Sequence, residues 1–491
     1  MVTANSSIGS LTGRRPARQT LIWCWGLFLA ISEDTRLKLL RFFVLLGLAL
    51  PAWAQYAGPA ILSRGEAPAA MIAPKVDFNF SVAVSGTYTN GLAGVSAPTA
   101  QGQLANLSSY GVGVVFGVSG AHTWRHTHLG LNYGGGFSYY PKASVADGLQ
   151  QGLLLGLTHQ FTKHISLSLQ ESAGWFRQFA PSTVSLNSSV PFDPSQSNIP
   201  TTDFYDNRTI YTSSGANLII QKSARLSLAL GGSYFADIRQ SSLLYGAKGE
   251  SATGNLQYRV SRRATIGGGY TFSHYSYTHS FGGAYVQGAN VSLSLRLSRG
   301  TEFSMYGGAS RVESSFEVTV PIDPIILAIL CPPNQLGPNG LPLPCPVSAA
   351  NYINHNLTWS PSFGARFSMS FRRGVAYVTV AEGITPGNGL FLTSRAATAA
   401  AGYGYTGLRK WSMNIGVSYV SALSLGNVQG GYGQISGWYG VSRQIVSWLN
   451  IVSSLNATQY TSNSFTGYNR LIYSASLGLG YSSHNIPLRF F

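Results

Sequence analysis

The sequence predicts an all-β fold, a transmembrane antiparallel up-and-down β-barrel of about 18 strands, with 16 as the next choice. Only 10% of the 491 residues are charged, whereas a soluble domain has about 25%. Long segments alternate apolar residues with small polar residues, which is the period of a strand. Short basic turns also recur along the chain at nearly even spacing, as expected of an array of one supersecondary unit.

The alternation shows that each unit is a β-hairpin with two different faces. Leu226, Leu228 and Leu230 fall on one parity, and Ser227 and Gly231 fall on the other. The arms run about 11–14 residues, enough to cross a bilayer with tilt, whereas soluble strands usually have about 5–6. After the first 55 residues the chain has no apolar run of the ~18 residues that a transmembrane helix needs.

The N-terminal segment has the features of a secretory signal. Arg36, Lys38 and Arg41 precede a short apolar core, and Ala52-Trp53-Ala54 forms a small-residue cleavage site. We therefore expect residues 1–54 to be a leader, because a membrane anchor would need a longer apolar core. Removing six basic and two acidic leader residues leaves a formal charge of +12 (16 − 4).

The mature chain divides into a Pro- and Ala-rich periplasmic lead, residues 55–74, and a barrel over residues 75–491. Lys75–Thr89 is the first strand, and two hairpins follow around Trp124–Arg125 and Lys163. Six further hairpins and a last strand, Asn469–Ser483, complete the count of 18. The six hairpins have basic turns at Lys222, Arg262 with Arg263, Arg299, Arg372 with Arg373, Arg409 with Lys410, and Arg443.

Loop length predicts the sidedness of the barrel. Short turns belong in the periplasm and long loops outside, so all the basic turns should face the periplasm. The long outer loops are Asn90–Asn106, Gln178–Asn207 and Val312–Asn354, and an even strand count places both termini in the periplasm. The aromatics that we expect in interfacial girdles are Tyr139, Tyr140, Trp175, Phe176, Tyr234, Trp411, Tyr419 and Trp448.

Two cysteines remain after cleavage, Cys331 and Cys345, in the Pro- and Gly-rich third of these loops. In an exported protein a pair at this spacing predicts a disulfide bond, worth about 3 kcal/mol on the loop-entropy model. A metal site made from two thiols alone is the weaker alternative.

Together these features resemble bacterial outer-membrane β-barrel proteins of the porin type. The signal peptide, the long alternating strands, the short inner turns and the terminal Phe491 carry the resemblance, although Pro487 interrupts the expected final strand. The resemblance is architectural and covers about residues 75–491, so no family residues are carried over. It implies a location in the bacterial outer membrane and contact with the barrel assembly machinery, outer-membrane lipid and lipopolysaccharide.

An 18-strand barrel is wide enough for an aqueous channel, so we expect passive diffusion of small hydrophilic solutes. Arg259, Arg296 and Arg366 share the small-polar parity of their strands and predict a lumen that prefers anions. Arg259 and Arg296 precede basic turns by three residues, or about 10 Å. Alternatively, these arginines are solvated wall residues or pair with Asp237 or Glu302.

The loop Gln178–Asn207 is a second candidate for a role in the channel. It carries Asp193, Asp203 and Asp206, and by position it resembles the loop that narrows the pore of general porins. A surface loop with ordinary Asp turns is the alternative interpretation, and the loop with the two cysteines could equally cap the barrel.

Other functions have weaker support. The cluster of His122, His126 and His128 has metal-like spacing but no nearby carboxylate, and no residue set indicates catalysis, so we expect neither an enzyme nor a cofactor. Nucleic-acid binding rests only on the pI of 9.8. A non-conducting structural or adhesive barrel working through its outer loops remains the alternative, and homo-oligomerisation stays open.

Overall fold

The computed structural model of the chain contains a closed antiparallel β-barrel. The described residues are 77–90, 108–142, 147–177, 208–239, 245–278, 280–322, 325–326, 349–386, 392–405, 407–408, 410–425, 430–462, 469–483 and 486–487. The expected leader and periplasmic lead lie outside them. Among the described residues, no helix has both the length and the apolar character needed to cross a membrane.

The barrel has the predicted 18 strands, followed by a two-residue strand, β19 (Ile486–Pro487). The first nine are β1 (Asp77–Asn90), β2 (Ser108–Thr123), β3 (Thr127–Tyr139), β4 (Gly148–Thr162), β5 (Ile165–Arg177), β6 (Arg208–Gln221), β7 (Leu226–Arg239), β8 (Ala247–Arg259) and β9 (Ala264–Tyr277). The next nine are β10 (Gly282–Arg296), β11 (Thr301–Pro321), β12 (Ala349–Phe371), β13 (Gly374–Thr385), β14 (Ser394–Tyr405), β15 (Trp411–Ser424), β16 (Gly431–Val446), β17 (Leu449–Ser462) and β18 (Arg470–Ser482).

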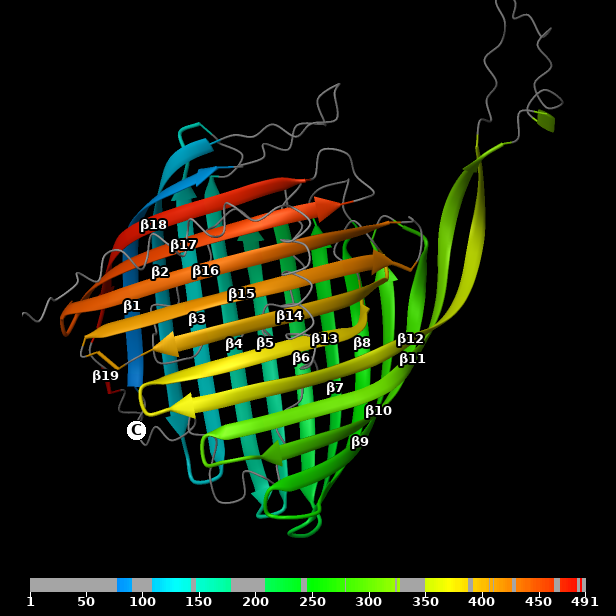
Figure 1. Ribbon diagram of the computed structural model, residues 1–491, viewed down its shortest axis with the longest axis horizontal. Coiled ribbons are helices and arrows are strands. Elements are labelled where there is room, and N and C mark those ends of the chain that lie inside the picture. The colour runs from blue at the N-terminus through cyan, green and yellow to red at the C-terminus, as the bar shows by residue number, and fades with distance from the viewer. Residues whose placement is uncertain are drawn as a thin grey trace, which may run out of the picture. The chain divides into compact units, whose positions relative to one another are not determined.

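Consecutive strands pair throughout, and β18 pairs with β1 to close the barrel (Figure 1). In the closing pair Val82 lies opposite Tyr481 and Val84 lies opposite Leu479. Pro487 does not prevent pairing, because β19 pairs with Asp77 and Phe78 of β1. Closure leaves no sheet edge, which would be costly in lipid.

The two faces of the strands have different environments. On β7 the exposed side chains Leu230, Tyr234 and Ile238 share one parity. The other parity faces the interior, because the hydroxyl group of Tyr277 on β9 lies 2.6 Å from that of Thr393, which directly precedes β14. Since β9 and β14 are not neighbours in the sheet, these side chains meet inside the barrel. Large apolar side chains therefore cover the outside, and small polar side chains line the lumen, as in a membrane barrel.

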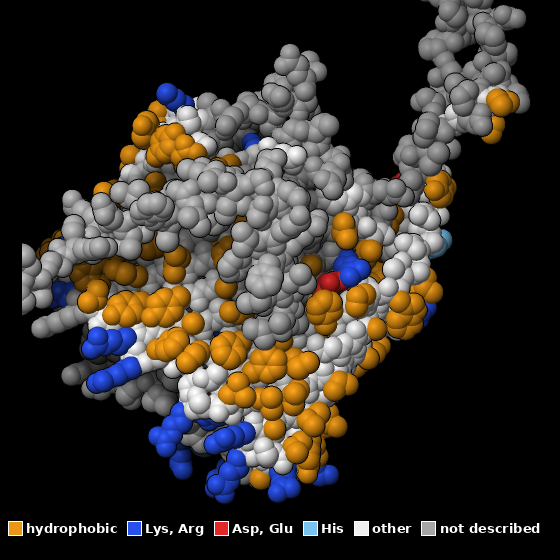
Figure 2. Space-filling model, in the orientation of Figure 1, with side chains coloured by type: hydrophobic (Ala, Val, Ile, Leu, Met, Phe, Trp, Pro, Cys, Tyr) orange, Lys and Arg blue, Asp and Glu red, His pale blue; other side chains and the backbone are white. Residues whose placement is uncertain are grey.

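The connections separate into a turn end and a loop end. The turns that follow the even-numbered strands have five residues or fewer and lie at the turn end. The connections after the odd-numbered strands lie at the loop end and include all the longer ones. On the face shown in Figure 2, Lys and Arg side chains gather at the turn end below a band of apolar side chains. The described basic residues in these turns are Arg125, Lys163, Lys222, Arg225, Arg262, Arg263, Arg299, Arg372, Arg373 and Lys410.

Two predicted boundaries are wrong. Arg443 belongs to β16 rather than to a turn, and the β16–β17 turn is Ser447–Trp448. The predicted loop Val312–Asn354 begins too early, since β11 continues to Pro321 and β12 begins at Ala349. These strands of 21 and 23 residues pair along their length and rise beyond their neighbours (Figure 1). The outer parts of both strands contain polar Asn and Ser residues, which strand pairing outside a bilayer tolerates.

The expected girdle residues divide by face. Tyr139, Tyr234, Tyr419 and Trp448 are exposed on the outside of the barrel. Tyr140 is not a girdle residue, because it is only 1% exposed and accepts or donates a hydrogen bond with Thr87. It follows Tyr139 directly, and the two-residue period turns its side chain inward.

Candidate functional site: the barrel lumen

The lumen face of β10, β11 and β12 brings together three charged residues at its turn-end half. Arg296 lies opposite Glu302, and Arg366 lies opposite Ser304, two residues along β11 from Glu302. Arg366 is exposed on the lumen face. The predicted parity of both arginines therefore places two cations and one carboxylate on one wall of the lumen.

Arg259 and Arg296 differ from Arg366 in what their guanidinium groups contact. Arg259 donates from Nε to the carbonyl oxygen of Ser261 at 3.1 Å and from Nη2 to that of Arg262 at 3.4 Å. Arg296 donates from Nη2 to the carbonyl oxygen of Arg299 at 3.5 Å. Both residues end their strands, so their side chains reach the carbonyl groups of the following turn and lie at the rim of the lumen.

Asp237 lies at the loop end, far from these arginines. It accepts a hydrogen bond at 2.8 Å from Arg239, and the two side chains are 17% and 1% exposed. Arg239 also interacts electrostatically with Tyr432 on β16, half-way around the barrel from β7. Side chains from opposite walls therefore approach one another at the loop end, which narrows the lumen there.

The connection between β13 and β14 adds to this narrowing. Leu392 and Thr393 are fully buried inside the barrel. The Thr393 hydroxyl group lies 2.6 Å from that of Tyr277, and its carbonyl oxygen accepts a hydrogen bond of 2.9 Å from the amide of Leu425. An apolar cluster surrounds Leu392, formed by Phe235, Tyr245, Tyr275, Tyr277, Ala284, Val286, Val312, Phe316 and Ile384.

The alternation of the strands does not predict this constriction. Its one sign in the sequence is the apolar run Leu390–Leu392, in a connection where polar residues are expected. The constriction that was predicted instead, from Asp193, Asp203 and Asp206, lies outside the described residues, as do Cys331 and Cys345 with their predicted disulfide. In the described part of the chain, no group of three or more His, Cys, Asp or Glu side chains could hold a metal ion.

The inward and outward faces together define the kind of barrel. Eighteen antiparallel strands close on themselves, expose large apolar side chains outward and place Ser, Gly and charged side chains inward. The chain has the architecture of a porin-like outer-membrane barrel. Barrels of 16–18 strands are wide enough to leave an aqueous channel.

Comparisons with known proteins add neighbours but no family. No protein-family model and no curated protein matches the chain. The outer membrane protein OpdK from Pseudomonas aeruginosa is 12% identical, with a TM-score of 0.37 over 83% of this chain and 98% of that chain. OpdO from the same organism is 13% identical, with a TM-score of 0.38 over 83% and 97%. The unliganded ferric citrate transporter FecA is 10% identical, with a TM-score of 0.41 over 83% and 64%.

These similarities are too low to assign a function. The lumen of this chain is therefore the basis for a function.

Proposed function

We propose that the protein is a channel of the bacterial outer membrane for passive diffusion of small hydrophilic solutes, with a preference for anions. The closed 18-strand barrel with a small polar inner face carries this proposal. A barrel of this size has room for water along its axis unless connections fill it. The turn end faces the periplasm, in keeping with its short turns.

The charges at the turn end support the preference for anions. Arg366 is exposed on the lumen face, and Arg296 and Arg259 add positive charge at the rim. On the wall formed by β10, β11 and β12, Glu302 is the carboxylate that faces these arginines. At the loop end, Asp237 and Arg239 form an ion pair and largely cancel. An anion entering the turn-end half therefore meets net positive charge.

Conductance of the purified full chain in a planar bilayer tests the proposal. We expect discrete ion-conducting steps and, in a KCl gradient, a reversal potential of the sign set by chloride. A stable barrel that never conducts would contradict the channel. A reversal potential of the opposite sign would contradict only the preference for anions.

A second candidate function is a non-conducting structural or adhesive barrel. The observation in its favour is the constriction at the loop end, where Leu392, Thr393 and Arg239 are almost completely buried. The same bilayer measurement separates the two functions. If the wild type does not conduct and Leu392→Ser does, the constriction closes the lumen, and the function lies in the connections at the loop end.

A further inference from the structure

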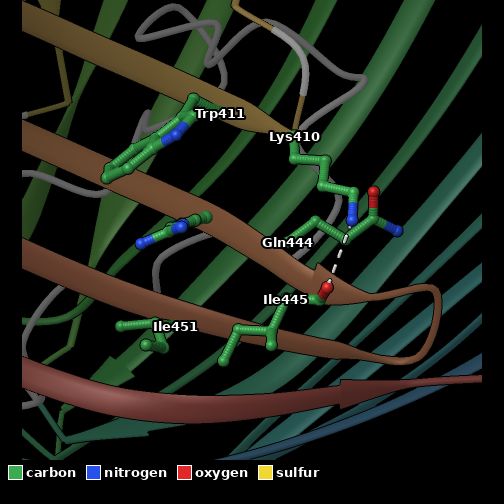
Figure 3. Close-up of a pocket in the computed structure, with 6 residues that line it drawn as sticks. Lys410, Trp411, Gln444, Ile445 and Ile451 are labelled. Atoms are coloured by element: carbon green, nitrogen blue, oxygen red, sulfur yellow. Dashed lines mark hydrogen bonds between the residues drawn. The ribbon is translucent and has the colours of Figure 1, made fainter.

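A pocket of about 290 Å³ lies at the turn end, between the β14–β15 turn and strands β15–β17. Its lining residues are Lys410, Trp411, Arg443, Gln444, Ile445 and Ile451. Figure 3 shows Lys410 extending past Gln444 toward Ile445, whose carbonyl oxygen accepts a hydrogen bond of 3.4 Å from Lys410 Nζ. The pocket therefore combines cationic, aromatic and aliphatic groups in one small volume.

This pocket is on the outside of the barrel rather than in the lumen. Trp411 lies opposite Arg443, Arg443 lies opposite Ile451, and Ile451 lies opposite Leu479, so all four share a face. That face is the apolar outer one, because Leu479 is 54% exposed and Ile415, on the parity of Trp411, is also 54% exposed. The pocket thus lies where the lipid-facing surface meets the turn end.

Arg443 and Lys410 are positioned by contacts with Trp411 and Ile445 that leave their positive charges unneutralised. The Arg443 guanidinium carbon lies 5.0 Å from the centre of the Trp411 ring, a cation–π distance that leaves the guanidinium edges available to an anion. None of the ion pairs formed between described residues includes Arg443 or Lys410. A phosphate group is the anion whose geometry suits an Arg beside a Lys.

The backbone gives an independent sign that Lys410 has a role. Among the described residues, Lys410 is the one non-glycine residue with positive φ, at 69°. An L-residue in this left-handed conformation is strained, and glycine is the residue that normally occupies it. Strained positions of this kind cluster at functional sites. The chain therefore has a charged lysine at a position whose backbone conformation alone would favour glycine.

Apolar and aromatic surface continues from the pocket along the outer face. Beyond Ile451 and Leu479 the same face carries Leu477, which is 64% exposed. At the same rim, the ring centres of Trp448 and Tyr481 lie 6.1 Å apart. Trp and Tyr are the aromatics that favour the membrane–water interface. A headgroup at Lys410 and Arg443 would thus have its acyl chains beside Ile451 and Leu479.

We propose that this pocket binds the phosphodiester headgroup of an anionic phospholipid from the periplasmic leaflet. Lys410 and Arg443 contact the phosphate, Trp411 orients Arg443, and the isoleucines contact the upper acyl chain. The other basic turns attract anionic lipid only as dispersed charge. The proposal does not depend on conduction, so it can fail or hold independently of the channel.

The test measures retention of phosphatidylglycerol by the detergent-solubilised full chain, using native mass spectrometry and phosphatidylcholine for comparison. We expect preferential retention of phosphatidylglycerol by the wild type. Arg443→Gln should lower its affinity about fivefold, since one cation near a membrane surface contributes about 1 kcal/mol. Lys222→Gln, in the β6–β7 turn, is the matched control and should change it less than twofold.

Lys410→Gly separates lipid binding from folding, because glycine relieves the backbone strain while removing the charge. It should fold at least as well as the wild type and lose phosphatidylglycerol affinity about fivefold.

Equal losses of phosphatidylglycerol affinity in Lys222→Gln and Arg443→Gln would overturn the proposal, as would unchanged retention of the lipid in Lys410→Gly. Glycerol phosphate is added as a competitor, and displacement at concentrations similar to the lipid would show a free-phosphate site instead.

Discussion

At the scale of single residues, the position of an arginine along its strand decides what its charge does. Arg259, Arg296 and Arg366 all lie on the lumen parity, as the alternation predicts. Arg259 and Arg296 end their strands and donate to carbonyl groups of the next turn. Arg366 lies five residues before the end of β12, and its side chain is exposed on the lumen face.

Arg366→Glu should therefore shift ion selectivity more than any substitution at the rim. Replacing a positive by a negative charge in a water-filled lumen raises the energy of a nearby chloride ion and lowers that of a nearby potassium ion by about 1 kcal/mol each. The chloride-to-potassium permeability ratio should therefore fall about thirtyfold. The reversal potential of the variant in a KCl gradient measures this change. Arg372→Glu makes the same charge change in the β12–β13 turn and is the control. A shift in the control as large as in Arg366→Glu would place selectivity at the rim.

At the scale of elements, local patterns predict the strands and do not predict how distant strands meet. The alternation around Leu226–Leu230 and the turn at Lys222 each lie within one hairpin, so the sequence shows them directly. The contact between Tyr277 and Thr393 joins residues far apart in the chain, and no periodicity signals it. The full length of β11 was also missed, because Glu313, Ser315 and Glu317 occupy the outward positions of its outer part instead of apolar residues.

The start of β10 provides a test of how closely its hairpin with β11 is packed. Gly282 has a φ of 118°, and a Cβ atom there would meet the backbone carbonyl oxygen of Ser315. Gly282→Ala should destabilise the barrel by about 2 kcal/mol, measured by urea unfolding in lipid vesicles. Gly307→Ala on β11 is the control, since its Cβ would have no atom within 4 Å, and it should be neutral or stabilising by about 0.5 kcal/mol. Similar losses in both variants would contradict the packing argument.

At the scale of the whole molecule, closure of the barrel gathers the basic turns into one positively charged rim. Because each strand pairs with its neighbour and β18 returns to β1, every basic turn lies at the same end of the barrel. The start of β1 and the end of β18 lie at that end as well, since the strand number is even. The sequence predicts this arrangement because it needs only the order of short and long connections. The constriction and the pocket at Lys410 and Arg443 depend on three-dimensional packing and could not be predicted from that order.

Cysteine labelling on intact cells tests which membrane side the basic rim occupies. In a background with Cys331 and Cys345 replaced by Ser, a membrane-impermeant maleimide should label Lys142→Cys, which is exposed in the β3–β4 connection at the loop end. Ser447→Cys, exposed in the β16–β17 turn, should react only after the outer membrane is permeabilised. Both should react in lysed cells, which controls for accessibility. The reverse pattern would place the basic rim outside, where the pocket at Lys410 and Arg443 would meet lipopolysaccharide instead of phospholipid. This one measurement therefore fixes the entry side of the proposed channel and the leaflet of the proposed lipid site together.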